Sequence, residues 1–155
     1  MCISADEETL YIILMLLNGD RKVNNLKTVF HIAIPCRDLE EAEDFYIKKL
    51  QCKLGRKYSD RITLNFFDTQ LVCHLYPEKI DSNPQIYPRH FGVIFNNQDD
   101  FSHVINLAKQ QNIEFIQETV HKRQGEAAEQ LTFYLKDPSN NIIQFKLFLN
   151  SEMVY

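Results

Sequence analysis

The sequence contains the same order of predicted elements twice, and this internal repeat constrains the fold more than any other feature. In the first copy, apolar and small residues alternate in VFHIAIP, which predicts a strand, and residues 38–50 continue with apolar side chains at helical spacing. In the second copy, RHFGVIF predicts the equivalent strand and residues 97–108 the equivalent helix. The period of the repeat is about 60 residues.

Three short segments of strand character complete each copy. They are KLGRKYS, RITLNFF and QLVCHLY in the first copy, and IEFIQETVH, QLTFYLKD and IIQFKLF in the second. Turn residues separate neighbouring segments, for example Ser59-Asp60 in the first copy and Asp137-Pro138-Ser139-Asn140 in the second. Each copy is therefore a βαβββ module. The sequence predicts an α+β fold of two such modules, each with its helix on the outer face of a sheet.

A proline-rich stretch separates the modules and sets the predicted boundaries. Module 1 covers residues 27–77, the connector 78–88 and module 2 89–148, so that residues 27–148 form one domain. Residues 1–26 form an N-terminal extension and residues 149–155 a C-terminal tail. The capping box Ser4-Ala5-Asp6-Glu7 predicts a short helix in the extension.

Composition excludes several classes of protein. The chain has 155 residues, which suits a single domain, and its 17 basic and 21 acidic residues give a net charge of −4, so a nucleic-acid partner is not expected. Its longest apolar run, residues 10–17, is much shorter than the ~20 residues of a membrane span. The four cysteines lie far apart and form no CxxC pair, which indicates reduced thiols and a cytoplasmic location.

Strand parity places one histidine of each module on the face that the helix does not cover. Successive residues of a strand face opposite sides, so His31 shares a face with Ala33, and His90 shares a face with Gly92. The bulky residues between them, such as Ile32 and Phe91, must cover the helix of their own module. Both histidines therefore point into whatever the two sheets enclose.

The last strand of each module adds one further candidate ligand. His74 shares a face with Gln70 and Val72, and Gln144 shares a face with Ile142. If the sheets curl toward each other, His31, His90 and Gln144 can converge, with His74 as a fourth residue. Imidazoles with an oxygen donor suit a divalent first-row metal. The alternative is that these side chains are hydrogen-bonded structural residues.

Polar residues of the neighbouring strands are expected on the same enclosed face. They are Thr63 and Asn65 in module 1, and Thr132 and Tyr134 in module 2. Tyr134 is a candidate proton donor and Asn65 a candidate orienting amide. The alternative is that all four only line the cavity.

Four segments resemble the vicinal oxygen chelate superfamily, which includes glyoxalase I, extradiol ring-cleavage dioxygenases, fosfomycin-resistance enzymes and bleomycin-binding proteins. The segments are VFHIAIPCRDLEEAEDFY, NFFDTQLVCHL, PRHFGVIF and GEAAEQLTFYLKDPSNNIIQFK. The resemblance covers Lys27 to Phe148, and small stand-alone proteins described as extradiol dioxygenases or glyoxalase-like proteins are the most similar. It implies two modules whose curled mixed sheets form a metal-binding cup.

The resemblance also implies a ligand set. It comprises His31, His90 and Gln144, with His74 two residues beyond the place of the remaining ligand in glyoxalase-type members. Gln144 stands where the family motif DPSGNxxEFK has a glutamate, and Asn140 replaces the turn glycine. A neutral amide should hold a dication less tightly than a carboxylate. The implied cofactor is a divalent metal, with Fe(II) expected first and Mn, Zn or Ni as alternatives.

The implied function is that of a metal-dependent enzyme acting on a small substrate with two adjacent oxygens. An extradiol dioxygenase-like and a glyoxalase-like activity both fit, with Tyr134 or His74 handling protons. The alternative is a non-catalytic, bleomycin-resistance-like binding module with a degenerate metal site. No membrane partner is expected. A monomer and a homodimer that exchanges modules are both open.

Overall fold

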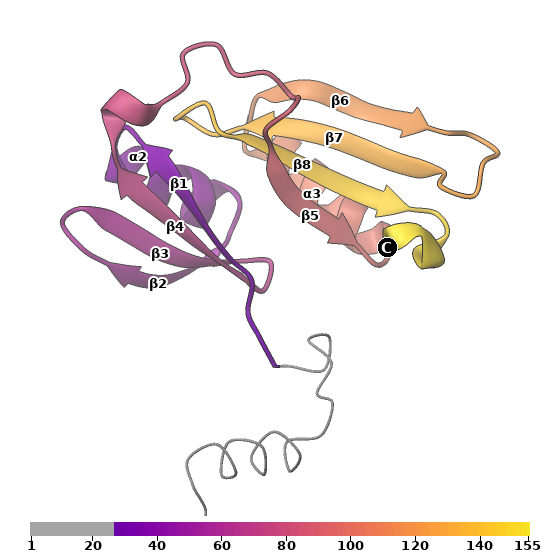
Figure 1. Ribbon diagram of the computed structural model, residues 1–155, viewed down its shortest axis with the longest axis horizontal. Helices are drawn as coiled ribbons and strands as arrows, with labels where there is room; N and C mark the ends of the chain where they lie inside the picture. The colour runs from indigo at the N-terminus through magenta and orange to yellow at the C-terminus, as the bar shows by residue number, and fades with distance from the viewer. Residues whose placement is uncertain (1–26) are drawn as a thin grey trace, which may run out of the picture.

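A computed structural model of the protein describes residues 27–155, so the helix predicted in residues 1–26 lies outside the described residues. The described part consists of two four-stranded sheets, each with one helical segment behind it (Figure 1). None of the helices in this part is long and apolar enough to cross a membrane.

The two sheets have the same topology, which confirms the predicted repeat. Sheet A has the order β1-β4-β3-β2 and sheet B the order β5-β8-β7-β6. In each, the first strand is parallel to the last, and the other neighbours are antiparallel. Sheet A comprises β1 (His31–Cys36), β2 (Lys53–Lys57), β3 (Arg61–Phe66) and β4 (Thr69–Leu75). Sheet B comprises β5 (Phe91–Phe95), β6 (Phe115–Lys122), β7 (Gln130–Lys136) and β8 (Ile142–Phe148).

The helices of the two modules differ in regularity. In module 2, α3 (Gln98–Gln110) is a continuous α-helix whose first turn is capped by the Asn97 side chain. In module 1, α2 (Leu39–Glu43) is capped by Asp38 and then widens into the π-helical η2 (Asp44–Lys49). The apolar spacing thus predicted a helix over this segment but not its change of pitch. Two 3₁₀ turns, η3 (Pro77–Lys79) and η4 (Ser151–Val154), complete the chain.

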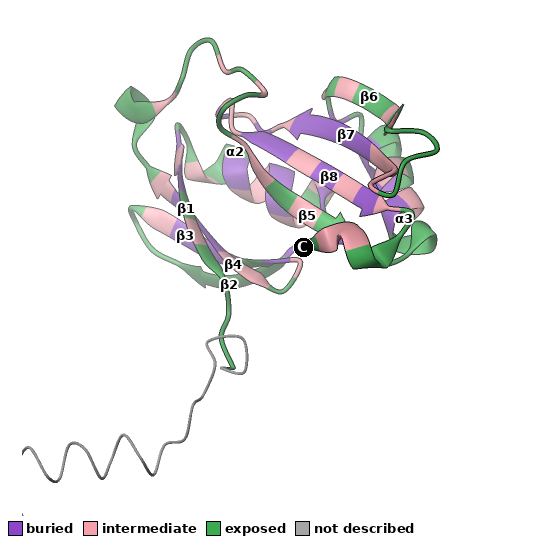
Figure 2. Ribbon diagram, turned by 45° about the vertical axis from the view of Figure 1, so that its right-hand side comes forward, coloured by how far each residue is buried: buried purple, intermediate pink, exposed green. Residues whose placement is uncertain are grey.

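One hydrophobic core joins the modules. The helix-facing side chains of both sheets form a single buried cluster (Figure 2). Rings from the two modules meet inside it: Phe66 lies 5.7 Å from Phe91, and Phe67 lies 5.8 Å from Phe95. Burial of this shared apolar surface is the main stabilising contribution to the arrangement of the two sheets.

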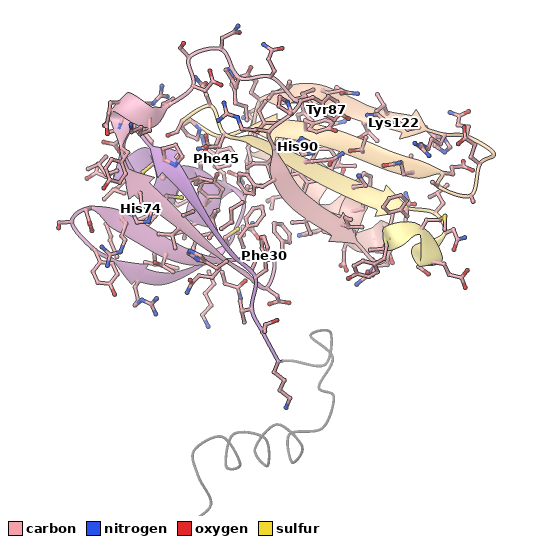
Figure 3. The ribbon with its side chains drawn as sticks, viewed as in Figure 1. Phe30, Phe45, His74, Tyr87, His90 and Lys122 are labelled. Atoms are coloured by element: carbon pink, nitrogen blue, oxygen red, sulfur yellow. The ribbon has the colours of Figure 1, made fainter. Side chains whose placement is uncertain are left out.

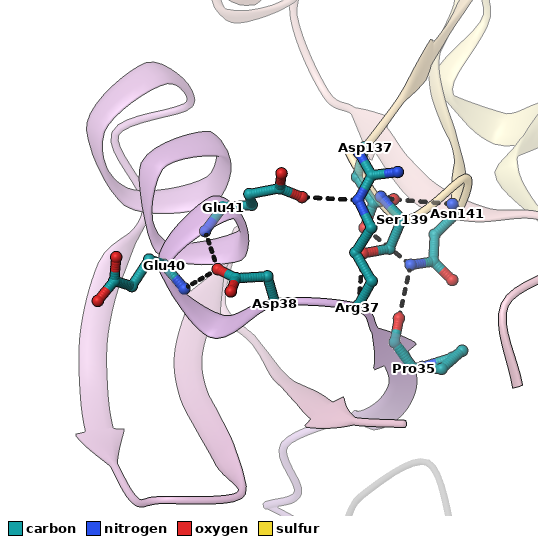
Figure 4. Close-up of polar contacts among 8 residues, drawn as sticks. All are labelled: Pro35, Arg37, Asp38, Glu40, Glu41, Asp137, Ser139 and Asn141. Carbon is teal, nitrogen blue, oxygen red and sulfur yellow. Dashed lines mark hydrogen bonds and ion pairs between the residues drawn. The ribbon is translucent and has the colours of Figure 1, made fainter. Parts of the chain in front are cut away.

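The turn between β7 and β8 adds polar contacts across the same junction (Figure 4). The Tyr46 hydroxyl of module 1 donates to Asp137 Oδ2 at 2.8 Å, and Asn141 Nδ2 donates to the Pro35 carbonyl at 2.9 Å. Arg37 N donates to Ser139 Oγ at 3.0 Å. Burial raises the pKa of Asp137, although hydrogen bonds from Asn141 and other donors oppose the rise. The turn therefore binds module 2 to module 1 through these hydrogen bonds.

Candidate functional site

The first and last strands of module 2 bring His90 and Gln144 together. In the parallel pair of β5 and β8, Gly92 lies opposite Gln144, and His90 is the diagonal neighbour on the same face. His90 Nε2 and Gln144 Oε1 are 3.1 Å apart, and both side chains are half-buried. A Cβ atom at position 92 would lie 1.8 Å from the Gln144 carbonyl oxygen. Only glycine permits this close approach of the two strands.

A backbone carbonyl fixes the proton position on the His90 ring. His90 Nδ1 lies 2.7 Å from the carbonyl oxygen of Ile86 in the connector. A carbonyl only accepts hydrogen bonds, so Nδ1 carries the proton. In the neutral ring, Nε2 then presents a lone pair toward Gln144.

A hydroxyl fixes the orientation of the Gln144 amide. Thr132 Oγ1 donates its one proton to the Phe145 carbonyl at 3.1 Å, so it can only accept from Gln144 Nε2, which lies 3.0 Å away. Gln144 Nε2 also donates to the Tyr134 hydroxyl at 2.8 Å. The amide oxygen is therefore turned toward His90, and two lone pairs face each other.

Tyr134 lies behind this pair. Its side chain is fully buried, and burial raises the pKa of its hydroxyl to about 12. The hydroxyl lies 3.4 Å from that of Tyr87, which covers it from the connector. Tyr87 is 64% exposed, so it, rather than Tyr134, faces open space. Sequence reasoning missed Tyr87 because the connector has no periodicity from which to infer where a side chain points.

A cavity of about 720 Å³ lies between the two modules beneath the connector. This volume is within the range of small-molecule sites. Its wall includes His74 at the end of β4, His90 at the start of sheet B and Tyr87 (Figure 3). One carboxylate, that of Asp81, is among the described lining residues, and it lies 3.6 Å from Arg89.

His31 lies apart from the other candidate ligands. It is the exposed first residue of β1, opposite Gln70, and it does not line the cavity. Within residues 27–155, no three His, Cys, Asp or Glu side chains are close enough to hold a metal ion together. Within these residues His90 contacts Gln144, and His31 forms no hydrogen bond with either of them.

Strand register accounts for the position of His74. The counterpart of Gly92 in module 1 is Ala33, and Ala33 pairs with Val72, so Val72 is the equivalent of Gln144. His74 pairs with Pro35, two residues farther along β4. It faces the cavity from the opposite wall and has no counterpart among the ligating positions of module 2.

The remaining candidates have other partners. Asn65 is bound to the β3–β4 hairpin turn, where its Oδ1 accepts from Asp68 N at 2.7 Å. Thr63 is buried within sheet A, and Thr132 orients Gln144. The structure thus assigns Asn65 a role in the turn and Thr132 a role in holding Gln144.

Comparison with known proteins agrees with this architecture. A family model described as "Glyoxalase/Bleomycin resistance protein/Dioxygenase superfamily" matches residues 28–145. No curated protein matches the chain. Among solved structures, a glyoxalase/bleomycin resistance protein/dioxygenase from Alicyclobacillus acidocaldarius is 49% identical, with a TM-score of 0.80, over 83% of this chain and 97% of that one.

Two more distant structures share the fold. Fosfomycin resistance protein FosX from Listeria monocytogenes is 13% identical, with a TM-score of 0.65, over 83% of this chain and 99% of that one. Lactoylglutathione lyase from Agrobacterium tumefaciens is 15% identical, with a TM-score of 0.60, over 79% of this chain and 94% of that one.

Proposed function

Since the chain belongs to the glyoxalase/bleomycin resistance protein/dioxygenase superfamily, we propose that it is a metal-dependent enzyme acting on a small molecule with two adjacent oxygens. The contact between His90 Nε2 and Gln144 Oε1 carries this proposal. Their hydrogen-bond partners turn two lone pairs toward each other, so a proton or a cation must lie between them.

The spacing of the two atoms fits a divalent cation. First-row dications bind imidazole nitrogen and amide or carboxylate oxygen at about 2.1 Å, and two such bonds at a right angle separate the donor atoms by about 3 Å. The observed separation is 3.1 Å. Imidazole suits iron, zinc and nickel, and carbonyl oxygen suits manganese, so we propose Fe(II) with Mn, Zn or Ni as alternatives.

We assign the third donor to His31 of a second copy of the chain. His31 is exposed and lies on β1, an edge strand, beside the exposed apolar side chains of Val29 and Phe30. An apolar edge of this kind suits a symmetric dimer, in which each of two equivalent sites combines residues of both copies. This assignment follows from the position of His31, which is exposed and does not line the cavity that His90 lines.

Mixing two defective variants tests this assignment. If each site takes His31 from one copy and His90 from the other, a His31→Ala chain paired with a His90→Ala chain has one intact site. Random reassociation should restore about a quarter of the parental sites. Sites formed within one chain would give no restoration, because every site would then lack one ligand.

The chain's own residues define the chemistry. When bound, a divalent cation acts as a Lewis acid on the two substrate oxygens. His90 and Gln144 would hold the cation, while Thr132 keeps the amide oxygen turned toward His90. His74, on the opposite wall of the cavity, is positioned to accept or donate a proton.

The cavity favours an extradiol dioxygenase-like reaction over a glyoxalase-like one. An isomerase of the glyoxalase type needs a base that removes a carbon-bound proton. The one carboxylate among the described lining residues, Asp81, already faces Arg89. The second candidate function, a non-catalytic binding module, is favoured by the fact that, among the candidate ligands in residues 27–155, hydrogen-bond distance joins only His90 and Gln144.

Metal titration tests the proposal. Anaerobic titration of Fe(II) or Mn(II) into metal-free protein should show saturable binding. His90→Ala and Gln144→Ala should each weaken it at least about 100-fold, because each removes a direct ligand. His103→Ala, which removes an exposed imidazole on α3, is the control and should bind like the parent. Absence of saturable binding in the parent would favour the binding module.

A further inference from the structure

Two lysines stand on the same face of sheet B as Gln144. Lys146 lies two residues after Gln144 on β8 and pairs with Thr132 across β7. Lys122, at the end of β6, pairs with Gln130. Alternate residues of a strand share a face, so one face of β7 carries Gln130, Thr132 and Tyr134. Their cross-strand partners lie on the same face, and these partners are Lys122, Lys146 and Gln144.

Both ammonium groups lie over aromatic rings of this face, and that of Lys146 is 5.3 Å from the centre of the Phe148 ring. Lys122 Nζ lies 5.8 Å from the centre of the Tyr134 ring. The Tyr87 hydroxyl lies 3.4 Å from that of Tyr134, and the Tyr87 ring packs edge-on against the His90 ring with centroids 5.6 Å apart. Figure 3 shows Tyr87, Lys122 and His90 over the same sheet. Lysine side chains span about 6 Å and strands lie about 4.8 Å apart, so lysines two strands apart can reach one small group.

Neither lysine has an acidic partner among residues 27–155. No ion pair in this part of the chain includes Lys122 or Lys146. The neighbouring acids have other partners: Glu129 faces His121, Glu118 faces Lys109 and Glu126 faces Arg123. In a chain of net charge −4, two uncompensated cations on one face of a sheet are a local excess of positive charge.

We propose that Lys122 and Lys146 bind an oxyanion of the ligand, a carboxylate or a phosphate, to which the Tyr87 hydroxyl also donates. This inference rests on the proposed function and narrows its substrate class. Two residues along a strand span about 7 Å, so the anionic group lies that far from the His90–Gln144 pair. The ligand is therefore a small acid whose two chelating oxygens lie a few bonds from its charged group. Charge-assisted hydrogen bonds supply the affinity.

Anion binding to metal-free protein tests this inference independently of the metal. Inorganic phosphate is titrated at low ionic strength and followed by calorimetry, with malonate in a second series to separate the phosphate and carboxylate classes. The parent should bind one of the two saturably, and added salt should weaken binding. The K122Q/K146Q variant should weaken binding about 10-fold or more. K53Q, which removes an exposed lysine on β2, should leave binding unchanged.

Two results would overturn the inference: no saturable binding of either anion by the parent, or equal weakening by K53Q and the double variant. The single variant K122Q controls for a folding defect: it should weaken anion binding while its thermal melt stays the same as that of the parent. Mn(II) affinity separates this inference from the proposed function. K122Q/K146Q should retain it, because removing positive charge does not weaken cation binding. A parent that binds phosphate but not Mn(II) would refute only the proposed metal site.

Discussion

The two modules share a backbone but differ in the row of side chains at the site. In module 2 this row runs from Gly92 through Gln144 to Tyr134 across β5, β8 and β7. The equivalent row of module 1 is Ala33, Val72 and Thr63 across β1, β4 and β3. The ladder of hydrogen bonds is the same in both, since it depends on the backbone alone. Repetition of the fold therefore does not imply repetition of the site.

Each module has a histidine at the equivalent position before its helix, but the surroundings of the two histidines differ. His31 and His90 both stand seven positions before the residue that caps the helix, Asp38 or Asn97. His90 meets an amide oxygen at 3.1 Å, whereas the diagonal neighbour of His31 is the buried Val72. Module 2 therefore holds the donor pair, and module 1 offers a single exposed imidazole.

The largest expected effect concerns the turns that close the last hairpin of each module. Asp137 in module 2 is buried and accepts from Tyr46, Ser139 and Asn141, whereas Asp68 in module 1 is exposed. Asp137→Ala should lower the free energy of unfolding by about 3 kcal/mol or more, because buried donors lose their acceptor. Asp68→Ala should cost less than about 1 kcal/mol. Urea denaturation of both variants measures the difference, and equal losses would contradict the account.

The next effect concerns strand separation. Gly92→Ala inserts a Cβ at 1.8 Å from a backbone oxygen and should cost about 3 kcal/mol while moving Gln144 away from His90. The converse change in module 1, Ala33→Gly, meets no such contact and should cost only about 0.5–1 kcal/mol. Thermal melts and Mn(II) titration of both variants test this. A Gly92→Ala protein with parental stability and metal affinity would show that the close approach is not required.

A smaller effect is expected from restoring a carboxylate at position 144. Gln144→Glu places a negative charge beside the cation. Metal affinity should rise about 10-fold if about 1.4 kcal/mol of the Coulomb attraction remains after the cost of desolvating the carboxylate. The Tyr134 hydroxyl can donate to the new carboxylate in place of accepting from the amide. Val72→Glu places the same charge beside His31, the donor assigned to the second copy, so it should raise affinity only where the dimer forms. Unchanged affinity with a lowered melting temperature in Gln144→Glu would remove Gln144 from the ligand set.

The smallest effect concerns the cysteines, whose three described members all lie in module 1. Burial raises the pKa of Cys36 to about 11 and that of Cys52 to about 12, and it raises the pKa of Cys73 as well. Thiolates are scarce at pH 8, so a Cys2→Ser protein should resist alkylation until it is denatured. Replacing all four cysteines should leave metal content within a few-fold. Rapid alkylation of the native protein would contradict this.

Periodicity predicted the fold because each element buries one face. Alternation in VFHIAIP and RHFGVIF placed both histidines opposite the core, and the structure has them there. Counting residues from the turn showed that His74 lies two positions beyond the expected ligand position. Only the register of β4 against β1 showed that Val72, and not His74, is the equivalent of Gln144. Parity within β8 placed Gln144 on the face of His90, although their contact depends on the close approach at Gly92.

Other features of the site depend on geometry that no pattern encodes. Tyr87 lies in a part of the connector that has no helix or strand, so its contact with Tyr134 was not predictable. The orientation of Lys122 depends on irregular register in β6, where the pairing shifts between Gln117 and Val120. Strand alternation places Asn65 on the enclosed face of its sheet, but its side chain instead accepts a hydrogen bond from the backbone of the adjacent tight turn.

Anomalous diffraction from crystals grown with Mn(II) tests the central claim most directly, because it locates the ion among the side chains. The account predicts one strong peak per chain, about 2.1 Å from both His90 Nε2 and Gln144 Oε1. A peak elsewhere, for example beside His74 in sheet A, would contradict it. So would the absence of any peak at saturating Mn(II) with the His90–Gln144 contact retained, since a proton on His90 would then satisfy the two facing lone pairs.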